Sequence, residues 1–312
     1  MQLFLETLLA SGRKGFELAF FVLMPIMVFM MAFMRVLEGK GVLRAAAVYA
    51  APVLVFFGLP GLGVFAILQI LLVSFAAPVS TLRIIDQDAD VSDRKLAATL
   101  AAILCMSQAN ATFPLAVVGL ELQTTMLSSL VGGLIASFLT YRYFGRHLAD
   151  ETEPRDEGQI AVGEGRRRVI DTLMVGAEEG FQLALKATPL LVLAVFAVNT
   201  LKNVGAIALV ERVFAPVLAL AGISGAAVLS IVTKYIAGGT AMMGATMPMI
   251  QDGTMSVAEL NRIAGFTINT FDPVGIAVLA SSGKRVAAFV VPAAKGALVG
   301  IVIRGAIHLA VF

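Results

Sequence analysis

The sequence is short of the residues from which disulfides, metal sites and nucleic-acid interfaces are built. It has one cysteine, Cys105, and so it forms neither a disulfide framework nor a cysteine-based zinc site. Its two histidines, His147 and His308, are too few for a histidine-rich metal site. Tryptophan is absent, and no stretch combines a basic face with aromatic side chains, so nucleic-acid binding has no support.

Charge is also scarce. Charged residues make up 14% of the chain and hydrophobic residues 59%, whereas soluble domains average about 25% and about 45–50%. We therefore expect an all-α integral membrane protein whose first partner is the lipid bilayer. The motifs GxxxxGK[ST] and HExxH are absent, and only one aspartate, Asp272, lies in an apolar segment. We expect neither an enzyme nor a resident cofactor or metal.

About ten hydrophobic segments follow one another along the chain. A helix that spans a membrane needs about 20 predominantly apolar residues, and most of the segments approach or exceed this length. They cover residues 15–37, 45–57, 61–82, 96–119, 124–144, 180–200, 205–220, 224–247, 260–279 and 286–311. A short amphipathic segment, residues 1–14, precedes them. A polar linker, residues 147–177, divides them into two repeats, residues 15–146 and 178–312.

The two repeats match at an offset near 164 residues. Pro25 lies opposite Pro189, and Ser92 opens the fourth segment of the first repeat as Ser256 opens that of the second. We expect a few residues to be lost from this offset inside the fourth segment. If each repeat crosses five times and the linker is cytoplasmic, the loop lysines and arginines gather in the cytoplasm. Five crossings also invert the second repeat, a construction common in secondary transporters.

Polar residues interrupt the fourth segment of each repeat, at residues 107–114 and at residues 269–273. Backbone groups in hydrocarbon must be satisfied inside the protein, so such breaks lie buried or line a cavity. Corresponding breaks in two repeats indicate a transport site. We therefore expect seven residues to bind a small polar solute: Ser107, Gln108, Asn110, Thr112, Asn269, Thr270 and Asp272. The alternative is that the breaks are loops between short helices at a membrane surface.

Asp272 has two interpretations. A carboxylate at membrane depth costs about 2.5–3.5 kcal/mol, which favours a cavity, a cation or a proton path, with H⁺ or Na⁺ as the coupling ion. It is equally suited to cap the helix that follows Pro273.

Two further residues join the expected site. Lys234 lies in the middle of segment 224–247, where it either binds an anionic group of the solute or pairs with a carboxylate. Thr240 belongs to the small-residue run 236–247, which either packs helices closely or unwinds to meet a solute. The carboxylates open to Lys234 are Asp272, Glu178, Glu179 and Glu211.

Three stretches of the second repeat carry a resemblance to a known family. They are Gly180-Phe181 with Pro189 and the following Val204-Gly205, the run 236–247, and the break 269–273. Together they resemble the membrane proteins with the nucleoside-recognition, or Gate, domain, and the resemblance extends over nearly the whole chain as two Gate-like repeats. Relatives include the spore maturation proteins A and B, bacterial ferrous iron permeases and concentrative nucleoside transporters. The resemblance implies a multi-pass protein of the bacterial inner membrane with a nucleoside-like cargo.

We therefore expect a secondary transporter of a small polar solute, which is a nucleoside, a nucleobase or an amino-acid-like molecule. Divalent-metal transport is one alternative, with Cys105, Met106 and Asp272 as the ligands on offer. A non-transporting membrane scaffold is another. The sequence leaves open the transport direction, the coupling ion, assembly as a homo-oligomer, and whether the broken segments span the bilayer or fold back.

Overall fold

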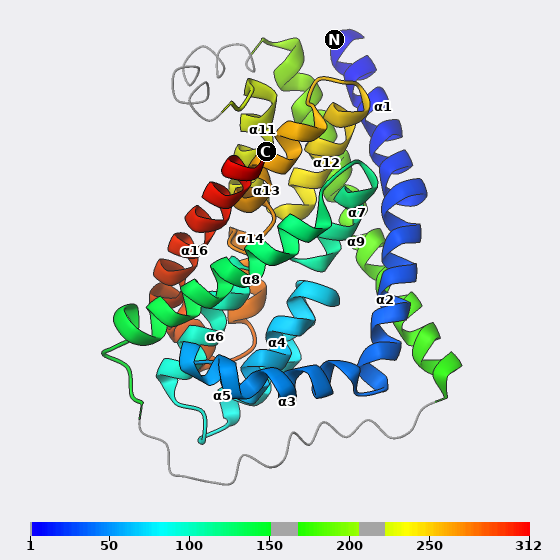
Figure 1. Cartoon of the computed structure of the whole chain (residues 1–312). Coiled ribbons are helices and arrows are strands. Elements are labelled where there is room, and N and C mark those ends of the chain that lie inside the picture. The colour runs from blue at the N-terminus through cyan, green and yellow to red at the C-terminus, as the bar shows by residue number, and fades with distance from the viewer. Residues whose placement is uncertain (1, 151–167, 206–221) are drawn as a thin grey trace.

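The computed structural model describes residues 2–150, 168–205 and 222–312, and these ranges contain helices and no strand (Figure 1). Within these described ranges, four helices qualify as membrane spans by length and composition: Phe4–Gly39, Asp93–Val117, Leu122–Phe144 and Val290–Val311. A fifth is possible if the pair Ala45–Phe57 and Gly61–Leu72, bent by 108°, forms one span. The chain is thus a multi-pass, all-α membrane protein. The expected count of ten spanning segments is not confirmed, and segment 205–220 lies almost wholly outside the described residues.

The first span is one continuous helix that includes the N-terminal segment. It consists of α1 (Gln2–Glu17), a π-helical turn η1 (Leu18–Leu23) and α2 (Met24–Gly39). It packs along α9 (Val169–Asn203), and the two run antiparallel (Figure 1). Phe4 meets Phe196 at one end with 5.6 Å between ring centroids, and Arg35 pairs with Glu179 at 2.6 Å towards the other. Gly180 allows the close approach, because a Cβ there would overlap the backbone of α2.

Segments 61–82 and 224–247 are each two helices rather than one. They form the hairpins α4 (Gly61–Leu72) with α5 (Pro78–Gln87) and α11 (Gly225–Ala237) with α12 (Gly239–Gln251). The Thr81 hydroxyl donates to Gln69 Oε1 at 2.7 Å, and the Thr246 hydroxyl donates to Ser230 Oγ at 2.8 Å. Each bond joins residues about equally far from the turn, so the arms lie antiparallel. The pattern of hydrophobic residues hides both turns because apolar residues continue through each of them.

The predicted interruptions are present. The broken helices are α6 (Asp93–Cys105) with α7 (Ala109–Val117), and α13 (Val257–Thr267) with α14 (Pro273–Ala280). They run antiparallel: Asp93 pairs with Arg285 near one end, and Asn261 accepts a hydrogen bond from the Glu121 N–H at 2.7 Å near the other. The residues that precede α7 and α14, Gln108 and Asp272, lie 164 positions apart. The offset is therefore kept through the break, and the expectation that residues are lost there is wrong.

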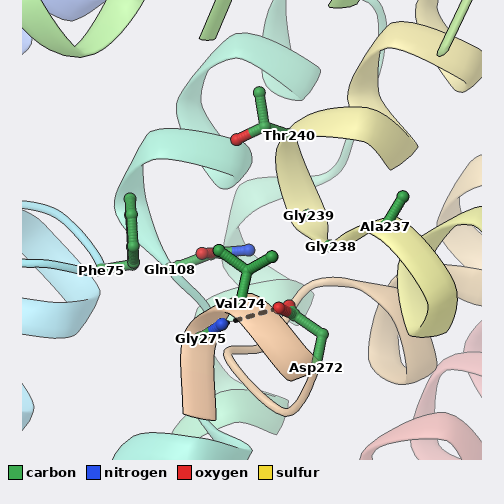
Figure 2. A pocket seen from close by; sticks show the side chains of 9 residues that line it. All are labelled: Phe75, Gln108, Ala237, Gly238, Gly239, Thr240, Asp272, Val274 and Gly275. Carbon is green, nitrogen blue, oxygen red and sulfur yellow. Dashed lines mark hydrogen bonds between the residues drawn. The ribbon is translucent and has the colours of Figure 1, made fainter. Parts of the chain in front are cut away.

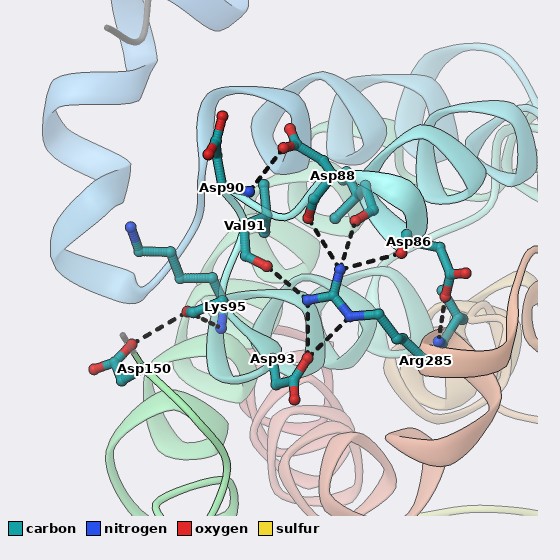
Figure 3. A network of polar contacts seen from close by, with 11 residues as sticks. Asp86, Asp88, Asp90, Val91, Asp93, Lys95, Asp150 and Arg285 are labelled. Atoms are coloured by element: carbon teal, nitrogen blue, oxygen red, sulfur yellow. Dashed lines mark hydrogen bonds and ion pairs between the residues drawn. The ribbon is translucent and has the colours of Figure 1, made fainter. Parts of the chain in front are cut away.

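The remaining elements complete the described part of the fold. They are α3 (Val42–Leu54), η2 (Val55–Phe57), α8 (Leu122–Leu139) with η3 (Thr140–Phe144), α15 (Lys284–Ala288) and α16 (Val290–Val311). Figure 3 shows how Arg285 of α15 ties the end of α5 to the start of α6. Its guanidinium pairs with Asp93 at 2.8 Å and donates to backbone carbonyls at Ile85, Asp86, Asp88 and Val91. Large apolar side chains such as Phe21 and Phe29 remain exposed on the first span, as expected of a lipid-facing surface.

Candidate functional site

The two breaks meet in the core, where side chains donate hydrogen bonds to backbone carbonyls across the contact. The Gln108 amide donates to the Asn269 carbonyl at 3.1 Å. The Thr270 hydroxyl donates to the Ile103 carbonyl, in the last turn of α6, at 2.6 Å. Since all these residues are buried, these two backbone carbonyls are satisfied within the protein, as backbone at membrane depth must be.

A buried ion pair joins the second hairpin to the second break. Lys234 of α11 donates through Nζ to Asp272 Oδ2, and the two side chains are 0% and 4% exposed. The other carboxylate oxygen, Oδ1, accepts the Gly275 N–H at 2.8 Å and so caps α14. Asp272 thus has both the pairing and the capping contact that the sequence leaves open. Glu179 pairs with Arg35 instead, and Glu211 lies outside the described residues.

A cavity of about 30 Å³ lies between the hairpin tip and the breaks (Figure 2). The tip residues Gly238 and Gly239 lie against Asp272 and Gln108: a Cβ on Gly238 would meet Asp272 Oδ1 at 3.2 Å, and one on Gly239 would overlap the Gln108 amide. The lining residues are Phe75, Gln108, Ala237, Gly238, Gly239, Thr240, Asp272, Val274 and Gly275. Pockets for drug-sized ligands measure about 300–1,000 Å³, so the hairpin is closed on the breaks in this conformation.

The expected site residues fall into two groups. Gln108, Thr240 and Asp272 line the cavity, whereas the other six do not. Of these six, Lys234, Asn269 and Thr270 make the contacts described above, so they position lining residues and the second break.

The last three belong to the first break. Asn110 accepts the Phe75 N–H at 3.1 Å, which ties the break to the tip of the first hairpin. The Thr112 hydroxyl donates to the Gln108 carbonyl at 3.0 Å, and the Ser107 hydroxyl accepts from Arg304 at 2.6 Å.

Two residues of α16, Arg304 and His308, are not among the predicted site residues. Arg304 is fully buried in α16 and bonds both breaks. His308 lies one turn further along, where Nε2 is 3.0 Å from Ser128 Oγ and Nδ1 is 2.6 Å from the Asn261 carbonyl. A signal was present, because a guanidinium within the last apolar segment needs a polar partner at depth.

The described residues give the metal-transport alternative no support. Within them, no group of three histidine, cysteine, aspartate or glutamate side chains is close enough to hold a metal ion. Cys105 is buried, and Asp272 is already bonded to Lys234 and the α14 N-terminus.

No protein-family model matches the sequence, and neither does any curated protein. Solved structures of CNTnw, a concentrative nucleoside transporter, do match. The inward-facing, substrate-bound structure is 18% identical with a TM-score of 0.67, covering 93% of this chain and 74% of CNTnw. A doubly substituted CNTnw variant in an outward-facing state is 18% identical with a TM-score of 0.67, covering 92% of this chain and 74% of CNTnw.

An intermediate state of a singly substituted CNTnw variant is 19% identical with a TM-score of 0.67, covering 93% of this chain and 75% of CNTnw. These inward-facing, outward-facing and intermediate structures have the same TM-score, so the likeness concerns the architecture rather than one transport state. No family model supports the expected Gate-domain membership. The chain shares its fold with CNTnw, a member of one of the groups that the sequence resemblance names.

Proposed function

We propose that the chain is a secondary transporter that carries a small polar solute, above all a nucleoside or nucleobase, across the bilayer. The observation that carries this proposal is the meeting of two interrupted helices under a hairpin tip, with Gln108, Thr240 and Asp272 around a closed cavity. Transporters built from inverted repeats place their substrate between such broken helices. The fold shared with CNTnw, one of whose structures is substrate-bound, supports the nucleoside class over the amino-acid-like class.

The proposal includes two inverted repeats, residues 15–146 and 178–312, joined by a cytoplasmic linker in a bacterial inner membrane. The antiparallel course of corresponding helices supports the inversion. The first span runs against α9, and α6–α7 runs against α13–α14. A two-fold relation in the membrane plane requires this arrangement.

Solute binding requires the second hairpin to move away from the breaks, because the closed cavity is too small for a nucleoside. This movement separates Lys234 on the hairpin from Asp272 on the break. Removing one partner of a buried ion pair costs about 3–5 kcal/mol, so the hairpin stays closed until a solute satisfies both charges. A nucleoside has hydroxyl donors for Asp272 and carbonyl or ring-nitrogen acceptors for Lys234. The pair therefore favours solutes that offer donors and acceptors together.

The coupling ion is part of the proposal. Among the described residues that line the cavity, Asp272 has the only ionisable side chain. A coupled H⁺ or Na⁺ would act through this carboxylate, either by protonating it or by competing with Lys234.

The test is uptake of radiolabelled uridine, adenosine, uracil and leucine into proteoliposomes that contain the full chain. We expect uptake of uridine, adenosine or uracil, and a loss of about tenfold or more in Asp272→Asn and Gln108→Ala, because each removes a hydrogen bond worth about 1.5 kcal/mol. Matched controls are Glu179→Gln and Asn199→Ala, which change a carboxylate and an amide in the contacts of α9.

The controls are expected to transport like the wild type. Leucine uptake alone would shift the proposal to the amino-acid-like class. A wild-type protein that is folded and carries none of the four solutes would refute it, as would unchanged transport in both site variants.

A further inference from the structure

A fully buried arginine lies where the first halves of the two broken helices end. Arg304 Nη1 donates to the carbonyl of Cys105, the last residue of α6, and to the carbonyl of Ile268, the C-cap of α13, the latter at 2.9 Å. Nη2 donates to the Ser107 hydroxyl at 2.6 Å. In the described parts of the chain, no ion pair joins this guanidinium to a carboxylate, although burying an unpaired charge is costly.

The helix ends supply the missing negative charge. The C-terminus of a helix carries a partial charge of about −0.5, from carbonyls that have no partner within the helix. Two such ends, those of α6 and α13, meet at Arg304. Their charges sum to about one negative elementary charge, which matches the single positive charge of the guanidinium.

The surrounding helices make room for this side chain. A Cβ on Gly132 of α8 would overlap the Arg304 Cγ, and a Cβ on Gly265 of α13 would overlap the Arg304 backbone carbonyl. Glycine at these two positions lets α16 approach both neighbours and bring the guanidinium between the two helix ends. Arg304 is therefore packed between the two broken helices rather than at the edge of their contact.

Soluble cations occupy comparable positions elsewhere: in transporters with broken helices, half-helix C-termini and unwound carbonyls coordinate Na⁺ or H⁺. We infer that Arg304 is a tethered cation that fills the place of a soluble monovalent cation, so that this centre functions without Na⁺. The meaning of this inference for coupling rests on the proposed transport function, but the electrostatic claim does not. If it holds, removing the guanidinium turns the centre into a site that a soluble cation can occupy.

The experiment measures thermal unfolding of the purified full chain in detergent by far-ultraviolet circular dichroism, without any transported solute. Na⁺ is compared with choline at equal ionic strength, and methylguanidinium is added at low concentration as a probe of the guanidinium site. Arg304→Ala is the principal variant. The matched control is Arg262→Ala, because Arg262 also donates to two main-chain oxygens, at Phe312 and Gly222, but is only partly buried.

We expect the unfolding temperatures of the wild type and Arg262→Ala to be indifferent to the choice of cation. Arg304→Ala should unfold at a lower temperature and gain a saturable rise of about 4 °C with Na⁺ or methylguanidinium over choline, the scale of saturating binding to a chain of this length. A wild-type Na⁺ shift that disappears in Arg304→Ala would overturn the inference. No gain in a folded Arg304→Ala would overturn it as well.

A comparison of two further variants covers the case in which Arg304→Ala does not fold. Arg304→Lys keeps the charge, whereas Arg304→Met keeps the length of the side chain without it. A folded Lys variant beside an unfolded Met variant supports the tethered cation, and a Met variant as stable as the Lys variant refutes it. Because no solute is added, these outcomes are independent of any failure of nucleoside uptake.

Discussion

The Lys234–Asp272 pair gives the sharpest stability prediction. Lys234→Met removes a charge that is fully buried and leaves Asp272 without its partner, retaining only the Gly275 N–H on the other oxygen. Breaking a buried pair by removing one partner costs about 3–5 kcal/mol. For a chain of this length, this loss lowers the unfolding temperature by about 5–8 °C.

The double variant should recover most of this loss. Asparagine in place of Asp272 still caps α14, since asparagine is among the preferred N-cap residues. Combined with Lys234→Met, it leaves no unpaired charge in the core, and replacing both members of a buried pair is often close to neutral. We therefore expect each single variant to be less stable than the double variant, so that the coupling energy exceeds the cost of Lys234→Met alone, about 3–5 kcal/mol.

The composition of the chain selects the assay. Tryptophan is absent, so intrinsic tryptophan fluorescence is unavailable as a readout. The single cysteine, Cys105, is fully buried beside the first break. A thiol-reactive fluorophore therefore labels the protein only when this part of the core opens, and the labelling temperature reports its unfolding.

Lys295→Met is the matched control, because Lys295 is a lysine of α16 that is exposed rather than buried. It should change the labelling temperature little. Additive effects of Lys234→Met and Asp272→Asn, or single effects no larger than that of the control, would refute the reasoning.

Four further predictions concern the hairpin tip, Arg285, Asp93 and the coupling ion. Gly238→Ala should lower the labelling temperature and abolish a solute-induced rise, because the tip has φ of +90° and closes on Asp272; Gly253→Ala, with φ of +72° in open space, should show the strain alone. Arg285→Ala should destabilise by about 2–4 kcal/mol through its lost carbonyl bonds. Asp93→Asn should cost under about 1 kcal/mol, since partly exposed ion pairs contribute little. In proteoliposomes, a pH gradient should drive uptake and a Na⁺ gradient should not.

The sequence predicts the breaks because their signals are local. Asp272-Pro273 combines a helix cap with a residue that cannot continue a helix, and amide side chains gather at the same depth in both repeats. Loss of regular hydrogen bonding at such places follows from the residues themselves. The offset near 164 relates the two repeats up to this point, but only the structure shows that it is kept through the break.

The two hairpins and the contacts of Arg304 could not be predicted from local sequence patterns. Apolar residues continue through the turn of each hairpin, so hydrophobicity alone does not distinguish two short helices from one span. The carbonyl partner of Arg304 at Cys105 is 199 positions away, and no local pattern in α16 identifies it. Similarly, Lys234 had four candidate carboxylates in sequence, and only the packing of α11 against the second break selects Asp272.

Where the broken helices cross, the negative ends of their first halves and the positive ends of their second halves face different groups. The negative ends of α6 and α13 converge on Arg304, which neutralises them at a position away from the cavity lining. The residues at the positive ends of α7 and α14, Gln108 and Asp272, line the cavity. Positive helix ends attract acceptor groups, and in this conformation the Asp272 carboxylate fills that role at α14. A solute that draws Asp272 away must therefore offer acceptors to the α14 N-terminus and donors to the carboxylate at once, as a ribose or a base edge does and a simple cation does not.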